Sequence, residues 1–210
     1  MDEARTIAVV GAGRVGTTLG ARWAEVGHTV RYGVRDPGAA RHAVLRRHAS
    51  VVDVPGAVLD VDVVLLAVPG AVVVEVARSL PDLGATVVVD ASNPLGADLR
   101  THDRVDASGA EQVAAALSGG RVVKAFNTTG SGNMADPSGY DPAPAMWLAG
   151  DDANACAVVA GLAADLGFDP VVVGPLAAAA DLEHLAVVWI RLAYTLGHGP
   201  DVAITLQRRR

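Results

Sequence analysis

The stretch Ile7-Ala8-Val9-Val10-Gly11-Ala12-Gly13-Arg14-Val15-Gly16 decides the fold. Its apolar first half is typical of a buried strand, the GxGxxG pattern follows at once, and a helix is expected directly after it. Each glycine has a mechanical task in that context: Gly11 allows a tight turn, Gly13 lets the backbone approach a pyrophosphate, and Gly16 lets the helix pack on the strand. Residues 7–35 are therefore predicted to form a dinucleotide-binding βαβ unit, with a glycine-rich turn that binds no ligand as the plainer alternative.

The end of the next strand indicates which dinucleotide binds. Residues 29–35 are predicted to form this strand, and an NAD-specific fold usually ends it with a carboxylate that accepts hydrogen bonds from the ribose. Val34 falls at that place and cannot accept one, whereas Arg35 offers a planar fork of N–H donors suited to a phosphate. We therefore expect NADP rather than NAD, with a solvated surface arginine as the alternative for Arg35.

The composition limits the classes of protein that fit. The 210 residues are 51% hydrophobic but only 4% aromatic, so the core is built from Val, Ala and Leu, as in parallel strands covered on both faces. The single cysteine, Cys156, excludes an intrachain disulfide and a cysteine-cluster metal site. A net charge of −6 argues against nucleic acid, and no stretch approaches the ~20 apolar residues that span a bilayer. We expect a soluble, cytoplasmic protein without a metal site, with no nucleic acid and no membrane as partner.

Strands and helices are expected to alternate along the chain. Strands are predicted at residues 62–69, 86–90, 121–127, 145–149 and 171–173, helices at 36–48, 71–79, 109–117, 152–166 and 176–196, and loops at 96–107 and 130–144. This alternation predicts an α/β fold, a doubly wound Rossmann NAD(P)-binding domain of residues 1–174. Residues 175–210 are predicted to be a C-terminal helical extension packed on the same domain.

Three of the predicted strands are followed by residues without acid–base chemistry: Pro69, Asn93-Pro94 and Asn127-Thr128. Such strand ends meet at the ligand crevice of an open α/β sheet. Oxidation of an alcohol normally requires His, Lys or Tyr there, but Lys124 lies inside a predicted strand and His184 is most simply a surface or interface residue. We therefore expect no catalytic side chain and a second substrate that is itself a small-molecule hydride carrier.

Five motifs occur in an order that resembles the NADPH-dependent F420 reductases and related dinucleotide-binding enzymes. The Lys-Ala-Phe-Asn-Thr part is the most specific of them, and the resemblance covers nearly the whole length. The motifs are Gly11-Ala12-Gly13-Arg14-Val15-Gly16, Gly33-Val34-Arg35-Asp36-Pro37, Ser92-Asn93-Pro94-Leu95, Val123-Lys124-Ala125-Phe126-Asn127-Thr128 and Val173-Gly174-Pro175-Leu176.

The resemblance implies hydride transfer between NADPH and coenzyme F420, or a flavin in some relatives. It also implies that residues 11–16 hold the pyrophosphate, Arg35 the 2′-phosphate, Pro69 and Asn93 the nicotinamide side, and Asn127 the face where the deazaflavin ring stacks. The full set of expected cofactor-binding residues is Gly11, Ala12, Gly13, Arg14, Val15, Gly16, Val34, Arg35, Val68, Pro69, Asn93, Pro94, Asn127 and Thr128.

Two alternatives for the function stay open, and one expectation concerns assembly. A small hydroxyacid or imine reductase usually needs a catalytic Lys or Asp and a larger helical dimer domain, whereas a non-catalytic NADPH-binding regulatory module needs neither. In the predicted terminal helix, apolar residues recur at helical spacing, a pattern of a core face that could also pair two copies, so we expect a homodimer. These residues are Leu182, Leu185, Val188, Trp189 and Leu192.

Overall fold

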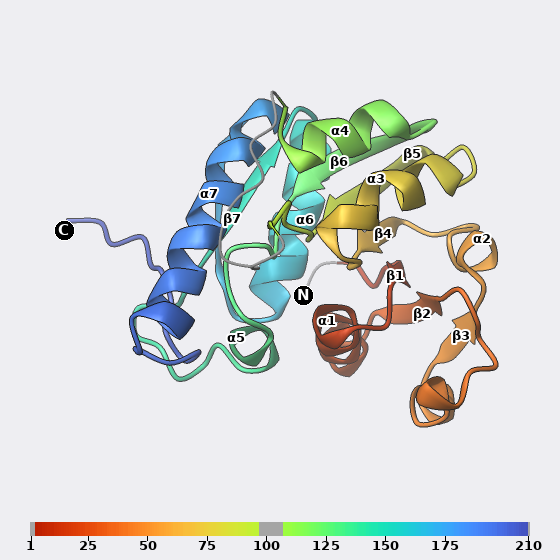
Figure 1. Cartoon of the computed structure of the whole chain (residues 1–210), viewed down its shortest axis with the longest axis horizontal. Helices are drawn as coiled ribbons and strands as arrows, with labels where there is room; N and C mark the ends of the chain where they lie inside the picture. Colours follow the sequence, from red (N-terminus) through yellow and green to blue (C-terminus); the bar gives the residue numbers. More distant parts are fainter. Residues whose placement is uncertain (1–2, 97–106, 210) are drawn as a thin grey trace.

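One mostly parallel sheet organises the chain in the computed structural model, which describes residues 3–96 and 107–209 (Figure 1). The strand order is β3-β2-β1-β4-β5-β6-β7-β8, in which β6 and β7 pair antiparallel and all other neighbours pair parallel. The strands are β1 (Thr6–Val10), β2 (Thr29–Gly33), β3 (Ser50–Val52), β4 (Val63–Leu66), β5 (Gly84–Asp90), β6 (Gly119–Lys124), β7 (Ala145–Gly150) and β8 (Asp169–Gly174).

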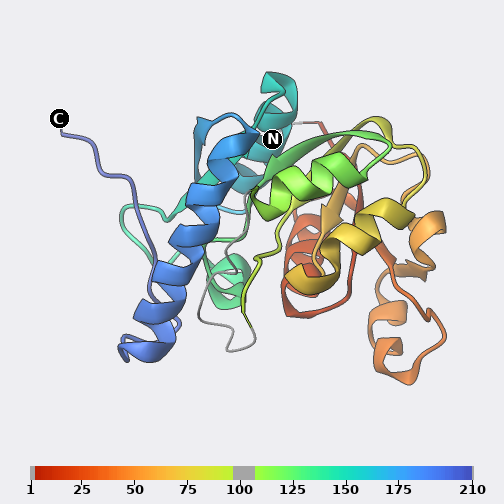
Figure 2. The same cartoon turned by 45° about the horizontal axis from the view of Figure 1, so that its top comes forward.

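Helices cover both faces of this sheet. Figure 1 shows α3 and α4 on one side of the strands and α1 and α5 on the other, and Figure 2 shows α7 running along the flank of the molecule. The helices are α1 (Arg14–Glu25), α2 (Val54–Ala57), α3 (Gly70–Ser79), α4 (Gly109–Ala116), α5 (Ser131–Ala135), α6 (Ala153–Asp165) and α7 (Ala179–Ile190). The predicted α/β Rossmann fold with a C-terminal helix is confirmed.

Alternating strand residues divide the core into two clusters. Ile7 and Val9 pack with α1 and α6 on one face, while Ala8 and Val10 pack with α2, α3, α4 and α7 on the other. All four side chains are buried, as expected for a central parallel strand covered on both faces. The apolar runs at β1 and β4 were therefore reliable signals of strands in the middle of the sheet.

The order of the strands creates a switch point beside β1. The chain leaves β1 through α1 to reach β2 on one side, while β4 lies on the other side. In open α/β sheets a ligand crevice forms outside the carboxyl ends of the strands at such a point. The strands β1, β4, β5 and β6 are parallel neighbours, so their carboxyl ends lie at the same edge of the sheet. The motifs that follow these strands therefore share that edge.

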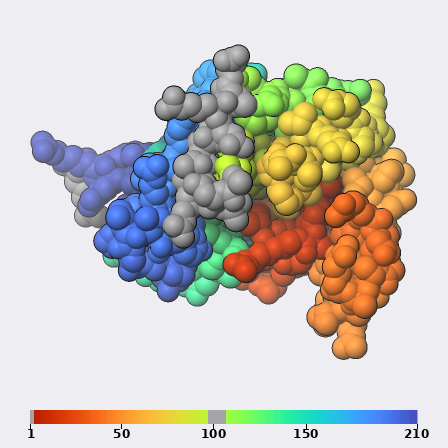
Figure 3. Space-filling view, viewed as in Figure 1, coloured from red at the N-terminus to blue at the C-terminus, as the bar shows by residue number. Residues whose placement is uncertain are grey.

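The helix predicted for residues 36–48 is wrong. Two short 3-10 turns stand there instead, η1 (Ala40–His42) and η2 (Leu45–Arg47), and they form the orange segment at the end of the molecule opposite α7 (Figure 3). The Asp36 carboxylate accepts a hydrogen bond from the Gly38 N–H, two residues on, which closes a local turn in place of a helix cap.

Two loop predictions have different outcomes. The segment 130–144 contains the short helix α5 (Ser131–Ala135), so it is not a continuous loop. The other predicted loop, residues 96–107, lies almost wholly outside the described residues. The three-residue strand β3 (Ser50–Val52) at the edge of the sheet was not predicted.

The terminal helix is observed nearly as predicted. A 3-10 turn η3 (Leu176–Ala178), α7 and a π-helical turn η4 (Arg191–Thr195) follow one another directly. Leu182 and Trp189 of the apolar stripe are buried in the same chain, whereas Val188 is 49% exposed. The homodimer stays a prediction. No helix in residues 3–96 and 107–209 combines the length and the apolar character needed to cross a membrane.

Candidate functional site

The backbone of the glycine-rich turn packs closely against the ends of β2 and β4. Gly11 has a φ of 106°, which favours glycine, and its N–H donates to the Gly33 carbonyl at 3.0 Å. A Cβ at Gly11 would lie 2.5 Å from the Ala67 carbonyl oxygen, and one at Gly16 would overlap the carbonyl oxygen of Gly11. Neither position has room for a side chain, so both glycines let the backbone of β1, β4 and α1 come together.

Gly13 differs from its two neighbours in the motif because it faces open space. No atom lies within 4 Å of a Cβ added there, and no side chain caps the α1 N-terminus that begins at Arg14. The first N–H groups of this 12-residue helix and its positive dipole end therefore suit an anion. Arg14 is exposed at the same end, whereas Ala12 and Val15 are half-buried against the core.

The end of β2 presents one arginine. Val34 is buried and its N–H donates to the Val52 carbonyl at 3.0 Å, so its side chain belongs to the interior. Arg35 follows it, is exposed, and makes no hydrogen bond or ion pair within the described chain. The Asp36 carboxylate is engaged with the backbone of Gly38. The polar group left available at this strand end is a guanidinium.

The ends of β4 and β5 meet through a second close backbone approach. Val68 and Pro69 lead from β4 into α3, and a Cβ at Gly70 would overlap the carbonyl oxygen of Asn93. Asn93 and Pro94, which follow β5, are half-buried. The sequence placed these strand ends on one crevice, and the structure brings them into contact.

Two asparagines join the ends of β5 and β6 to α7. The Asn93 Nδ2 donates to the backbone carbonyl of Asn127 at 2.9 Å. The Asn127 Nδ2 in turn donates to Asn93 Oδ1 at 2.9 Å and to the Leu182 carbonyl at 3.1 Å. Thr128, the next residue, is buried. This reciprocal contact, which we call the amide pair, fixes both side chains at the ends of β5 and β6.

Backbone strain at Phe126 precedes the amide pair. Phe126 has a φ of 59°, in a region that bulky residues rarely occupy at a cost of about 1–2 kcal/mol. Its ring is buried and packs edge-on against Trp23 with 5.5 Å between ring centroids, and its N–H points at the Met146 sulfur at 3.2 Å. Core packing therefore maintains a turn that directs Asn127 to the edge of the sheet.

A buried ion cluster lies under the amide pair. The Lys124 Nζ contacts Asp90 Oδ2 at 2.9 Å, Glu183 Oε1 at 2.9 Å and the Ser92 carbonyl oxygen at 2.6 Å, and all three charged side chains are fully buried. The other Asp90 oxygen accepts from the Ser92 N–H, and Glu183 also accepts from the Gly109 N–H at the start of α4. The cluster thus connects β5, β6, α4 and α7.

The ion cluster gives a structural role to Lys124, the sole lysine of the chain. An ammonium has three N–H donors, and the three oxygen partners of Lys124 account for all of them. Lys124 is structural, as the sequence suggested, but its partners Asp90 and Glu183 were missed. The available signal was a carboxylate ending an apolar strand and another inside the apolar terminal helix, since buried charges are normally paired.

The one histidine considered for the site lies outside this cluster. His184 is exposed on α7, and its Nδ1 lies 2.7 Å from the Ala180 carbonyl oxygen one turn earlier. In residues 3–96 and 107–209 there is no group of three or more His, Cys, Asp or Glu that could hold a metal ion. The described part of the site is therefore built from backbone, two amides and two exposed arginines, Arg14 and Arg35.

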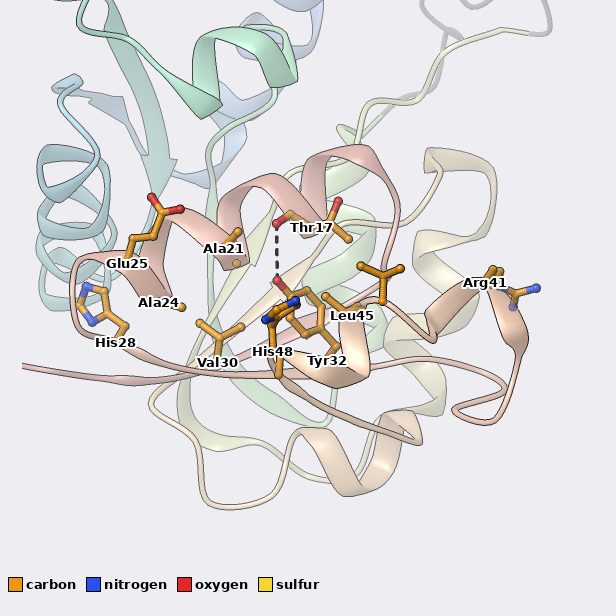
Figure 4. A pocket seen from close by; sticks show the side chains of 13 residues that line it. Thr17, Ala21, Ala24, Glu25, His28, Val30, Tyr32, Arg41, Leu45 and His48 are labelled. Atoms are coloured by element: carbon orange, nitrogen blue, oxygen red, sulfur yellow. Dashed lines mark hydrogen bonds between the residues drawn. The ribbon is translucent and has the colours of Figure 1, made fainter.

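A separate groove of about 890 Å³ opens between α1 and the segment that holds η1 and η2 (Figure 4). Thr17, Tyr32 and His48 are among its lining residues, and burial raises the pKa of Tyr32 to about 12, so that its hydroxyl stays protonated at neutral pH. None of the residues at the ends of β4, β5 and β6 lines this groove. The groove is therefore distinct from the strand ends at which the fold is expected to bind its ligand.

Comparisons with known proteins agree with this geometry. Residues 6–94 match the family described as NADP oxidoreductase, coenzyme F420-dependent. The crystal structure of a candidate F420-dependent NADP-reductase from Arthrobacter sp. FB24 is 30% identical, covers 98% of this chain and 100% of its own, and superposes with a TM-score of 0.86. A hypothetical protein from Sinorhizobium meliloti is 31% identical over 83% of this chain and 87% of its own, with a TM-score of 0.73.

More distant structures share the fold alone. A reductive aminase from Aspergillus terreus, solved with NADPH and ethyl levulinate, is 18% identical and has a TM-score of 0.63. The match covers 89% of this chain but only 60% of the aminase. These proteins therefore contain a substantial part that has no counterpart in this chain.

Replacing Lys124 with methionine is expected to lower the free energy of unfolding by about 3–5 kcal/mol, because two interior carboxylates lose the ammonium that they share. Arg121→Met is the matched control, since Arg121 pairs with Asp152 at the surface at 3.5 Å and should contribute only about 0–1 kcal/mol. Urea unfolding measures both values. Equal, small losses in the two variants would contradict a stabilising role for the cluster.

Proposed function

Because the chain belongs to the family of coenzyme F420-dependent NADP oxidoreductases, we propose that it transfers a hydride between NADP(H) and coenzyme F420 or a flavin. The observation that carries this proposal is the chemical character of the ends of β4, β5 and β6. In the described residues, these strand ends hold an amide pair, backbone and proline, and the Lys124 ammonium and the Asp90 carboxylate are engaged with one another in the interior. Such a site orients two rings, and ring-to-ring hydride transfer needs orientation above all.

The residues present fit a dinucleotide laid across the switch point. The open space at Gly13 and the α1 N-terminus would hold the pyrophosphate, with Arg14 beside it. Arg35, at the end of β2, would bind the 2′-phosphate on one side. Asn93, at the end of β5 on the other side of β1, would then lie toward the nicotinamide.

The chemistry divides between the bound molecules and the chain. When bound, NADP(H) and the second ring carrier supply the hydride donor and acceptor. The amide pair orients polar groups of the ligands, and the ion cluster beneath it holds the ends of β5 and β6 at a fixed separation. The Lys124 Nζ is directed at three oxygen partners in the interior, so no catalytic role is assigned to it.

Selectivity for NADPH is expected to depend on Arg35. A charged hydrogen bond of about 1.5–3 kcal/mol corresponds to roughly 10- to 100-fold in affinity, so Arg35→Ala should weaken NADPH by that factor and leave NADH nearly unchanged. Arg78→Ala, which removes an exposed arginine at the end of α3, is the control and should change neither. Fluorescence titration gives the dissociation constants. Equal losses for both cofactors would show that Arg35 does not bind the 2′-phosphate.

The second substrate is tested by steady-state oxidation of NADPH with F420, FMN, FAD and a cyclic imine in parallel. We expect turnover with F420 or a flavin and none with the imine, because protonation of an imine needs a positioned acid that the described site lacks. Turnover of the imine alone would replace this proposal with an imine reductase. Tight NADPH binding without turnover of any acceptor would instead indicate a regulatory NADPH-binding module.

A further inference from the structure

We propose that Arg46 is a positioning residue for the recognition of the 2′-phosphate. Its guanidinium is hydrogen-bonded to the turn that follows Arg35, and these bonds hold the backbone from which the Arg35 side chain reaches the phosphate. The inference rests on the proposed binding of NADP(H). It assigns a part in NADPH selectivity to a residue that contacts the turn rather than the ligand.

The turn after Arg35 is closed by its own residues. The Ala39 N–H donates to the Asp36 carbonyl at 3.2 Å, and the Gly38 N–H donates to the Asp36 carboxylate at 3.0 Å. Pro37 stands second in this turn, where its fixed φ is favoured, so the order Asp-Pro-Gly suits a tight turn. These bonds lie within the turn, however, and do not fix its place relative to the sheet.

Arg46 supplies a contact that holds the turn in place. Its Nη1 donates to the Pro37 carbonyl at 2.5 Å and to the Ala39 carbonyl at 3.1 Å. One terminal nitrogen of a guanidinium carries two N–H groups, so both are used on this turn. Bonds from a charged donor are stronger than bonds from a neutral one. The two bonds, which we call the Arg46 clamp, therefore restrain the turn even at the surface.

The Arg46 clamp is connected to the core. Arg46 lies in the middle of η2, and its neighbour Leu45 packs against the apolar cluster that contains Tyr32. The Ala49 N–H donates to the Leu45 carbonyl at 3.0 Å, and β3 begins one residue later at Ser50. A hydrogen-bonded turn therefore joins Arg46 directly to the edge of the sheet.

Arg35 stands between two restrained segments. Val34, before it, is buried, and its N–H donates to the Val52 carbonyl of β3 at 3.0 Å. The turn held by the Arg46 clamp begins directly after it. The Arg35 side chain itself is exposed and makes no hydrogen bond or ion pair in the described part of the chain. The clamp thus sets the direction in which this guanidinium leaves the backbone, which lowers the ordering cost of binding a phosphate.

The charge of the segment favours an anion. Residues 35–48 carry four arginines and a single carboxylate, in a chain whose formal net charge is −6. Arg46 and Arg47 are neighbours in η2 and are both exposed, but the Arg47 guanidinium has no partner in the described residues. The two arginines therefore contribute the same charge, and only Arg46 holds the turn. Charge and positioning can be separated by experiment for this reason.

A double-mutant cycle separates positioning from a direct contact. Fluorescence titration gives the dissociation constants of NADPH and NADH for the wild-type protein, Arg46→Ala, Arg35→Ala and the double variant. Arg46→Ala is expected to weaken NADPH about threefold to tenfold, because Arg35 is less well ordered before binding, and to change NADH by less than about twofold. In the Arg35→Ala background, Arg46→Ala should change NADPH by less than about twofold, because the residue that it positions is gone.

Arg47→Ala is the matched control, since it removes the same charge from η2 and leaves the Arg46 clamp intact. It should change the dissociation constant of NADPH by less than about twofold, because water and salt screen an exposed charge. Thermal unfolding of each variant checks that the fold is kept. If Arg46→Ala does not fold, Arg46→Lys replaces it, because lysine keeps the charge but loses the planar pair of N–H groups, and the same loss is expected.

Three results would overturn the positioning role. They are a loss of NADPH affinity below about twofold in the Arg46 variant, an equal loss in Arg47→Ala, and a loss that is the same with and without Arg35. A wild-type protein that does not bind NADPH, or binds it no more tightly than NADH, contradicts the proposed function itself. The failure of the positioning role and the failure of the proposed function are therefore distinguishable.

Discussion

The site depends on the buried ion cluster in which the Lys124 ammonium contacts three oxygen atoms. It lies in the interior against Asp90, Glu183 and the Ser92 carbonyl, and these partners belong to β5, α7 and the turn after β5. Ionised groups are tolerated there only with close partners, so the strand ends and the terminal helix cannot move independently of one another. The amide pair adjoins this cluster, because Asn93 follows Ser92 and the Leu182 carbonyl that binds Asn127 precedes Glu183. The cluster therefore also restricts the movement of the amide pair.

The glycine turn between β1 and α1 depends on a different constraint, namely that side chains are absent there. Gly11 and Gly16 remove the Cβ atoms that would overlap Ala67 and the turn itself, while Gly13 leaves open space at the start of α1. One side of the switch point thus offers backbone N–H groups to an anion, and the other offers fixed amides to a ring. A dinucleotide carries an anionic pyrophosphate and a nicotinamide ring, and their order along the molecule matches these two sides.

The sequence allowed the central part of the fold to be predicted because local signals agree there. Apolar runs at β1 and β4 and the glycines between β1 and α1 all favour the same unit. The helix expected at 36–48 failed because Asp36 closes a turn with Gly38, and the same residue types serve either a cap or a turn. Composition gives no rule that separates the two.

The positions of Asn93 and Asn127 at the strand ends could be predicted from the sequence, but their contacts could not. Asn93 and Asn127 were placed at neighbouring strand ends, yet their mutual hydrogen bonds depend on strand register and on the left-handed backbone at Phe126. Direct hydride transfer between two rings is the central claim, and deuterium transfer tests it. With NADPH deuterated stereospecifically at C4 of the nicotinamide, mass spectrometry of reduced F420 should find the deuterium from one of the two labelled forms retained at C5. Reduced F420 that carries only solvent hydrogen from both forms would contradict the account.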